Sequence, residues 1–208
     1  MSRKGVGLAE HVRQRWLAYA IACLVFVIGT VSGAVTIKAV TFHQKQDLIS
    51  YINTYFQTMM VGKLEAATWQ SVVWMNFQTV ILMWLCGLIV FGVPVLIGLI
   101  FARGFVIGFS VGFLVDELGI KGLLFALASI IPHNLITVPA LVGLGALGIS
   151  FSFSVIFGGK QRMALRRGTS PALQYSINTL LFFLLMAAAS LVEVFITPVF
   201  IKAALTLF

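Results

Sequence analysis

Two polar sites inside long apolar stretches are best placed to do chemistry in this sequence. His133 and Asn134 follow Pro132 within one uncharged stretch, and Glu193 lies in the last apolar region. Ionisable side chains at membrane depth are costly and normally face the interior of a helix bundle. A contact of the imidazole or the amide with the carboxylate would hold helices together, which is the interpretation we favour. The alternative is that these groups form part of a proton or ion path.

Arg103 is a third charged candidate near the same depth. A positive residue at the end of an apolar run commonly marks the cytoplasmic end of a membrane span. We therefore favour the simpler prediction, in which Arg103 ends a span in the cytoplasm.

Other side chains able to catalyse a reaction are scarce. The chain has three histidines, six carboxylates and two cysteines, and neither His11 nor His43 has metal ligands at a suitable spacing. Cys23 and Cys86 fall in predicted spans, where cysteine usually packs as a small apolar residue. The sequence contains no phosphate-binding loop, nucleophile elbow or His-Glu-x-x-His helix. It therefore predicts no enzyme, no ATP-hydrolysing subunit, no metal and no other cofactor.

The composition places these residues in a membrane protein. Of 208 residues, 60% are hydrophobic and 10% charged, where a soluble domain has roughly 45–50% and about 25%. Helical spans need about 20 apolar residues, and longer uncharged runs cover residues 16–37, 66–102, 122–159 and 168–192. The predicted fold class is an all-α polytopic transmembrane helix bundle, with one integral membrane domain over residues 1–208. A soluble enzyme, a nucleic-acid-binding protein and a disordered chain are disfavoured.

The net charge of +8 arises mainly from two basic clusters, an arm at residues 1–15 and a loop at residues 158–171. Positive residues near span ends mark the cytoplasmic side, so we expect both clusters and the N-terminus in the cytoplasm. The first apolar segment is long and lacks a small-residue cleavage pattern. It is expected to stay as an anchor.

About five crossings satisfy these constraints. The expected spans are residues 16–40, 77–101, a short 104–115, a half-helix at 122–131 continued at 135–157, and a last span from 172 to about 191–197. The fourth is expected to be broken near Pro132, where irregular backbone must be shielded by protein or water. The alternative, a tight hairpin of two short helices, would put the second basic cluster outside.

Gly104, Gly108 and Gly112 recur every four residues, which allows close contact between helix backbones. We favour such a structural contact over a pore lining. The sequence leaves open whether the contact forms within one chain or between two.

The external segment, residues 41–75, is expected to contain an amphipathic helix. Its apolar residues recur at helical spacing, among them Leu48, Ile52, Tyr55 and Phe56. This helix either rests on lipid headgroups, which we favour, or forms a docking surface for an extracytoplasmic partner.

Three segments also carry a family resemblance. Residues 41–56 begin Thr-Phe-His-Gln-Lys-Gln-Asp-Leu, residues 102–116 contain Arg-Gly-Phe-Val-Ile-Gly-Phe-Ser-Val-Gly-Phe, and residues 131–135 read Ile-Pro-His-Asn-Leu. In this order they resemble stage II sporulation protein M. The likeness covers about residues 10–160, while Glu-x-x-x-Thr-Pro at residues 193–198 matches loosely.

The resemblance implies a non-enzymatic membrane scaffold of endospore formation. Such a protein lies in the mother-cell membrane around the forespore, is required for engulfment, and holds two peptidoglycan-degrading partners, sporulation proteins D and P. Membrane lipids are expected partners, self-association stays open, and no nucleic acid is expected. The alternative function is a small transporter or permease subunit with a polar path at His133 and Glu193.

Overall fold

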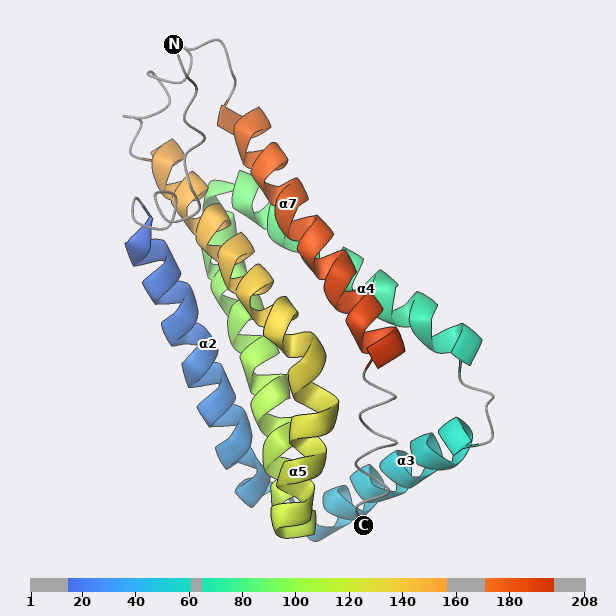
Figure 1. Cartoon of the computed structure of the whole chain (residues 1–208). Helices are drawn as coiled ribbons and strands as arrows, with labels where there is room; N and C mark the ends of the chain where they lie inside the picture. The colour runs from blue at the N-terminus through green and yellow to red at the C-terminus, as the bar shows by residue number, and fades with distance from the viewer. Residues whose placement is uncertain (1–14, 61–64, 157–170, 197–208) are drawn as a thin grey trace.

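The computed structural model describes residues 15–60, 65–156 and 171–196, and in these ranges every regular element is helical (Figure 1). The basic clusters predicted at residues 1–15 and 158–171 lie almost entirely outside the described residues. The elements are α2 (Trp16–Thr36), η1 (Ile37–Ala39), α3 (Phe42–Met60), α4 (Glu65–Leu88), η2 (Val90–Gly92), α5 (Val93–Ile156), α7 (Pro171–Leu191) and the π-helix η3 (Val192–Ile196). The predicted all-α membrane-helical fold is confirmed.

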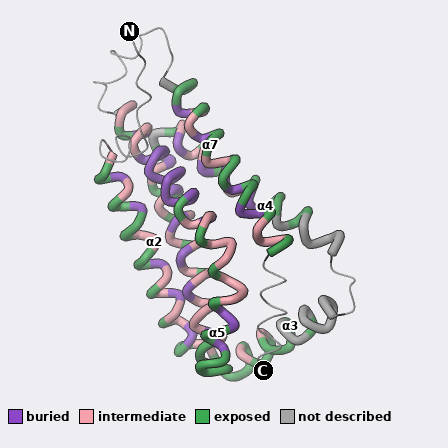
Figure 2. The backbone as a smooth tube through the Cα atoms, viewed as in Figure 1, coloured by how far each residue is buried: buried purple, intermediate pink, exposed green. Residues whose placement is uncertain are grey.

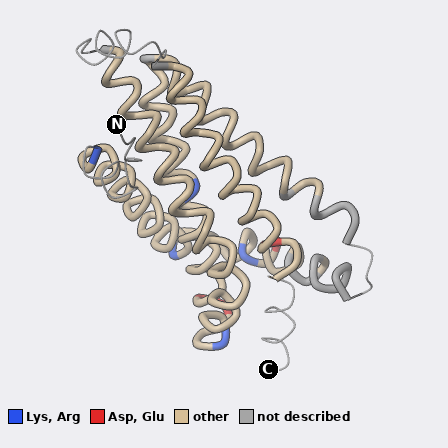
Figure 3. Tube along the Cα trace, turned by 45° about the horizontal axis from the view of Figure 1, so that its top comes forward, with Lys and Arg blue, Asp and Glu red and all other residues tan. Residues whose placement is uncertain are grey.

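Length and composition allow three of these helical segments to cross a membrane: Trp16–Ala39, Val93–Val155 and Ala172–Ile196. A shorter apolar stretch, Val73–Leu88, lies in α4. Large apolar side chains such as Leu24 on α2 and Leu184 on α7 are more than half exposed, and exposed residues line the outside of the bundle (Figure 2). Charged side chains are sparse along the described chain (Figure 3). Such a surface suits lipid and not water.

Helix α5 is a hairpin of two limbs, residues 93–118 and 120–156, which run side by side (Figure 1). The turn is at Gly119, whose φ of 57° and ψ of −133° are non-helical. This conformation is almost restricted to glycine. The limbs therefore run antiparallel, and residues equally distant from Gly119 lie at the same level of the bundle.

The boundary predicted between the second and third spans was wrong. Helix α4 ends at Leu88, and the break lies at residues 89–92 instead of near Arg103. The first limb begins at Val93 and continues through Arg103, so the short span expected at residues 104–115 is the second half of a long helix. Pro94 lies in the first turn of this limb, where proline's missing N–H leaves no helical bond unmade.

The break predicted near Pro132 was also wrong, because the second limb continues through Pro132 and Pro139. A proline inside a membrane helix is tolerated when neighbouring groups satisfy the freed backbone. The carbonyl that Pro132 leaves without its helical donor is that of Ala128, and Asn134 adds a separate side-chain hydrogen bond from its Nδ2 to the carbonyl of Ile130 at 2.8 Å. The half-helix at residues 122–131 and the span at residues 135–157 are therefore one continuous helix.

Helix α2 packs against the first limb of α5 through backbone-to-backbone contact. Glycines from both helices form this seam, and a Cβ atom on most of them would overlap the backbone opposite. Gly29 and Gly33 face Phe101 and Phe105, while the ladder of Gly104, Gly108 and Gly112 faces Phe26, Thr30 and Ala34. Small residues permit this close approach where no water drives helix association. The structure thus places the glycine ladder in a contact within one chain.

Toward its C-terminal end, the second limb of α5 runs through the centre of the bundle. Residues 140–149 are all buried and all apolar. In this core Leu141 and Leu144 cluster with Met83 of α4, Ile100 of the first limb and Met186 of α7. A helix that is apolar on every side is a buried helix.

Helix α3 lies across the Gly119 end of the bundle (Figure 1). Lys45 donates a hydrogen bond to the Asp116 carboxylate, and its Nζ lies 3.7 Å from Oε1 of Glu117. The hydrogen bond to Asp116 is the main cause that raises the pKa of Lys45. Because this pKa is raised, the stabilisation is fully present at neutral pH and is lost only as the pH rises through the folded-state pKa of the lysine.

The seam between α2 and α5 can be tested by adding one methyl group. Gly108→Ala should lower the free energy of unfolding by about 1–3 kcal/mol, because the new Cβ meets the backbone of Thr30. Gly98→Ala is the matched control, since a Cβ there meets nothing within 4 Å. Thermal unfolding of the purified protein in detergent measures both. Equal effects of the two substitutions would contradict a tight seam.

Candidate functional site: an intramembrane polar cluster

Arg103 and His133 come to the same level because they lie on opposite limbs of the α5 hairpin. At about 1.5 Å per residue, Arg103 is about 24 Å before Gly119 along the first limb, and His133 is about 21 Å after it along the second. Both side chains are partly buried. The hairpin thus places two ionisable groups near the middle of the bundle.

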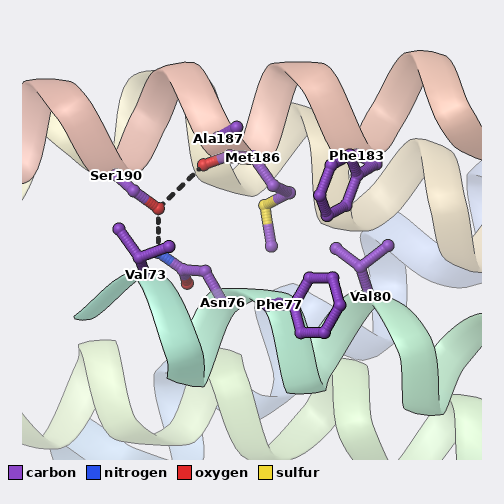
Figure 4. Close-up of a pocket in the computed structure, with 8 residues that line it drawn as sticks. All are labelled: Val73, Asn76, Phe77, Val80, Phe183, Met186, Ala187 and Ser190. Carbon is purple, nitrogen blue, oxygen red and sulfur yellow. Dashed lines mark hydrogen bonds between the residues drawn. The ribbon is translucent and has the colours of Figure 1, made fainter. Parts of the chain in front are cut away.

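Arg103 begins a chain of hydrogen bonds that links three helices. Its Nη2 donates to Oδ1 of Asn76 on α4 at 3.4 Å. The Asn76 amide donates to Oγ of Ser190 on α7 at 2.9 Å, and Ser190 donates to the carbonyl of Met186 at 3.0 Å (Figure 4). Asn76 and Ser190 are almost fully buried. Helix α7 is thereby joined to α4 and to the first limb of α5 by polar contacts.

These contacts form one wall of an apolar crevice between α4 and α7 (Figure 4). Most of its lining is aliphatic or aromatic, and the polar atoms come from Asn76 and Ser190. The lining residues are Val73, Asn76, Phe77, Val80, Phe183, Met186, Ala187 and Ser190.

The contacts of His133 define which ring nitrogen carries its proton. Nδ2 of Asn134 lies 3.1 Å from Nε2 of His133 and also donates to Ile130. An amide nitrogen can only donate, so Nε2 must accept. This assigns the neutral tautomer with its proton on Nδ1.

Glu193 lies in the π-helix η3, which follows α7 directly. π-helical turns are rare and occur often at functional sites. The carboxylate interacts electrostatically with both Arg103 and His133, and these two interact with each other. Among the described residues, neither a hydrogen bond nor an ion pair within 4 Å joins Glu193 to them. The structure therefore brings the predicted group of His133, Asn134 and Glu193 into one region without a direct contact between imidazole and carboxylate.

The prediction that Arg103 ends a span was wrong, and Asn76 was missed. The first limb begins near Pro94, so Arg103 lies inside a membrane helix and not at its end. A helix start at Pro94 was the sequence signal that could have revealed this. Asn76 is a polar residue on an apolar helix, but the sequence contains many such residues and does not single it out.

The structure describes only part of the surface predicted on the external helix. Leu48 is half-buried, while the side chains of Ile52, Tyr55 and Phe56 lie outside the described residues. Two aromatic side chains of α3 are strongly exposed: Phe42 at 70% and Tyr51 at 73%. In the part of the chain that the structure describes, no three His, Cys, Asp or Glu side chains are grouped as a metal site would need.

The fold and the cluster together define a helical membrane protein with ionisable side chains held inside the bundle. The sequence matches the family of stage II sporulation protein M over residues 22–198, which is most of the chain. The protein belongs to this family and is a sporulation-related membrane protein. No curated protein and no solved structure matches it.

A double-mutant cycle tests whether Arg103 and Glu193 act as counter-charges. Arg103→Gln and Glu193→Gln should each lower the free energy of unfolding, because each leaves one buried charge uncompensated. The double variant should recover part of the loss, with a coupling of about 0.5–3 kcal/mol. Unfolding of the four proteins in detergent gives the coupling.

The exposed pair Lys45 and Asp116 supplies the control cycle, with Lys45→Gln and Asp116→Asn. Its coupling should be smaller and should weaken further with added salt. Additive losses at Arg103 and Glu193 would contradict the counter-charge role.

Proposed function

We propose that this protein is a non-enzymatic membrane scaffold of endospore formation that holds peptidoglycan-degrading partners at the membrane engulfing the forespore. Family membership supports the link to sporulation. By resemblance, the partners are sporulation proteins D and P. In this proposal the protein binds and positions them and does not cut peptidoglycan itself.

One structural observation carries the scaffold role. Helix α3 projects across the Gly119 end of the bundle, and Lys45 ties it to Asp116 and Glu117 at the hairpin tip. A helix joined to the hairpin tip by this ion pair, with exposed Phe42 and Tyr51 outside the apolar core, offers a partner an accessible aromatic surface. Aromatic side chains of this kind commonly anchor protein interfaces.

The proposed orientation places this surface outside the cell membrane. Helices α2, α4, the two limbs of α5, and α7 would make five crossings, with the N-terminus in the cytoplasm. Both basic clusters then lie on the cytoplasmic side, as the bias of positive residues favours. The Gly119 end and α3 face the space between the two membranes, where peptidoglycan is degraded. The mother-cell membrane around the forespore is the proposed location.

The bundle interior favours a scaffold over a transporter. A transporter at this site would need a polar route from the cluster of His133 and Glu193 to both ends of the bundle. The second limb instead continues from the cluster into residues 140–149, which are buried and apolar. Over these ten residues the second limb therefore supplies no polar side chain to such a route.

Capture of the tagged protein from sporulating cells in mild detergent tests the scaffold. We expect the two peptidoglycan hydrolases to be recovered and identified by mass spectrometry. The pair Phe42→Ser and Tyr51→Ser should reduce their recovery at least severalfold, because it removes the exposed aromatic groups of α3.

Leu180→Ala and Leu184→Ala form the matched control, since these side chains are exposed on α7 away from α3. Their hydrolase recovery should equal that of the unmodified protein at equal abundance. Failure to recover either hydrolase with the unmodified protein would contradict the scaffold, whatever the variants do.

A further inference from the structure

We propose that Arg103, His133 and Glu193 form a binding site for a single water molecule inside the membrane, which bridges the three side chains. The site lies between the two limbs of α5 and the π-helix η3. It is independent of the scaffold function, because it requires no partner and no particular membrane.

Each of the three side chains has a buried polar atom without a hydrogen-bond partner among the described residues. These atoms are Nε of Arg103, Nδ1 of His133 and Oε2 of Glu193. Buried polar atoms in folded proteins are almost always paired, with protein or with ordered water. Three unpaired atoms on neighbouring charged or titratable groups therefore point to a shared ligand.

The positions of the three side chains in the fold, together with their unpaired atoms, fit a bridge better than a direct contact. Arg103 and His133 lie at about the same level of the hairpin, and Arg103 is joined through Asn76 to Ser190, which lies about one helical turn before Glu193, so the three side chains lie in one region. No direct hydrogen bond or ion pair connects them in the described structure. Polar groups that face each other beyond hydrogen-bonding distance are commonly joined by a water.

The donors and acceptors match water. Arg103 presents an Nε–H donor, and the tautomer fixed by Asn134 gives His133 an Nδ1–H donor. Glu193 presents an acceptor oxygen. A water molecule can accept from both donors and donate to the carboxylate, which gives it the two to four partners that buried waters make.

The charges of the site argue against an ion as its ligand. The positive charge of Arg103 and the negative charge of Glu193 cancel, and His133 in the assigned tautomer is neutral. The described side chains of α4 and α7 that pack beside η3 include no charged group. A bound anion would meet the Glu193 carboxylate and a bound cation would meet the Arg103 guanidinium, whereas a neutral dipolar molecule interacts favourably with both.

Solid-state NMR of the full-length protein in lipid bilayers tests the site. With ¹⁵N-labelled histidine, magnetisation transferred from water to each imidazole N–H reports a nearby water molecule. The chain has three histidines, and His133→Phe identifies the signal of His133. We expect Nδ1 to carry the proton and to receive magnetisation from water.

Variants at residue 193 provide the matched comparison. Glu193→Leu should abolish the transfer to His133, because the acceptor of the bridge is lost. Glu193→Gln should retain it, since the amide oxygen still accepts a hydrogen bond. His43, exposed on α3, should receive magnetisation from water in every variant and serves as the internal control.

Three outcomes would overturn the proposal. The first is no transfer to His133 in the unmodified protein while His43 is positive. The second is a measured hydrogen-bonding distance between His133 and the Glu193 carboxylate. The third is equally strong transfer to the backbone N–H groups of residues 140–149 in a uniformly ¹⁵N-labelled sample, which would indicate a water-filled path instead of one bound molecule. All three are read from the unmodified protein, so they hold even where Glu193→Leu does not fold.

Discussion

The turn at Gly119 is the constraint on which the rest of the structure depends. Its φ of 57° reverses the direction of α5 without a loop, a conformation that side chains other than glycine adopt only with strain. Because the limbs are antiparallel, this turn brings Arg103 and His133 to one level and presents Asp116 and Glu117 at the tip. Both the intramembrane cluster and the attachment of α3 follow from this single reversal.

Different interactions hold the helices on the two sides of the hairpin. On the α2 side, glycines let two backbones touch, so van der Waals contact dominates. On the α4 and α7 side, side-chain polar contacts run from Arg103 through Asn76 to Ser190. Apolar packing alone discriminates poorly between helix registers in lipid, whereas buried polar groups must find specific partners. The polar contacts therefore specify the position of α7 on the hairpin, while the glycine seam holds α2 against the first limb.

The sequence was sufficient for the fold class and insufficient for its internal boundaries. Apolar composition predicted a helical membrane bundle, but it contains no signal that separates one apolar helix from the next. Arg103 was predicted to end a span because positive residues commonly mark cytoplasmic span ends. The break at Pro132 was predicted because the uncharged stretch at residues 122–159 is too long for one plain span and too short for two. The first expectation failed because a tertiary partner, Asn76, accepts a hydrogen bond from Arg103 inside the bundle. The second failed because residues 120–156 form one continuous helix, longer than the roughly 20 residues of a span, that passes through Pro132. The partner of Arg103 is set by the packing of α4 against the hairpin, which local patterns do not reveal.

The cluster and the external helix are mechanically connected through the same two limbs. Arg103 lies on the limb that ends in Asp116 and Glu117, and Lys45 of α3 contacts that end. About 20 Å of continuous helix separates Arg103 from Asp116, at about 1.5 Å per residue. One helix therefore makes both the contact of Arg103 with α4 and the contact of Asp116 with α3, so the position of this limb constrains both. The packing inside the membrane and the attachment of the outer helix therefore depend on the same limb of the hairpin.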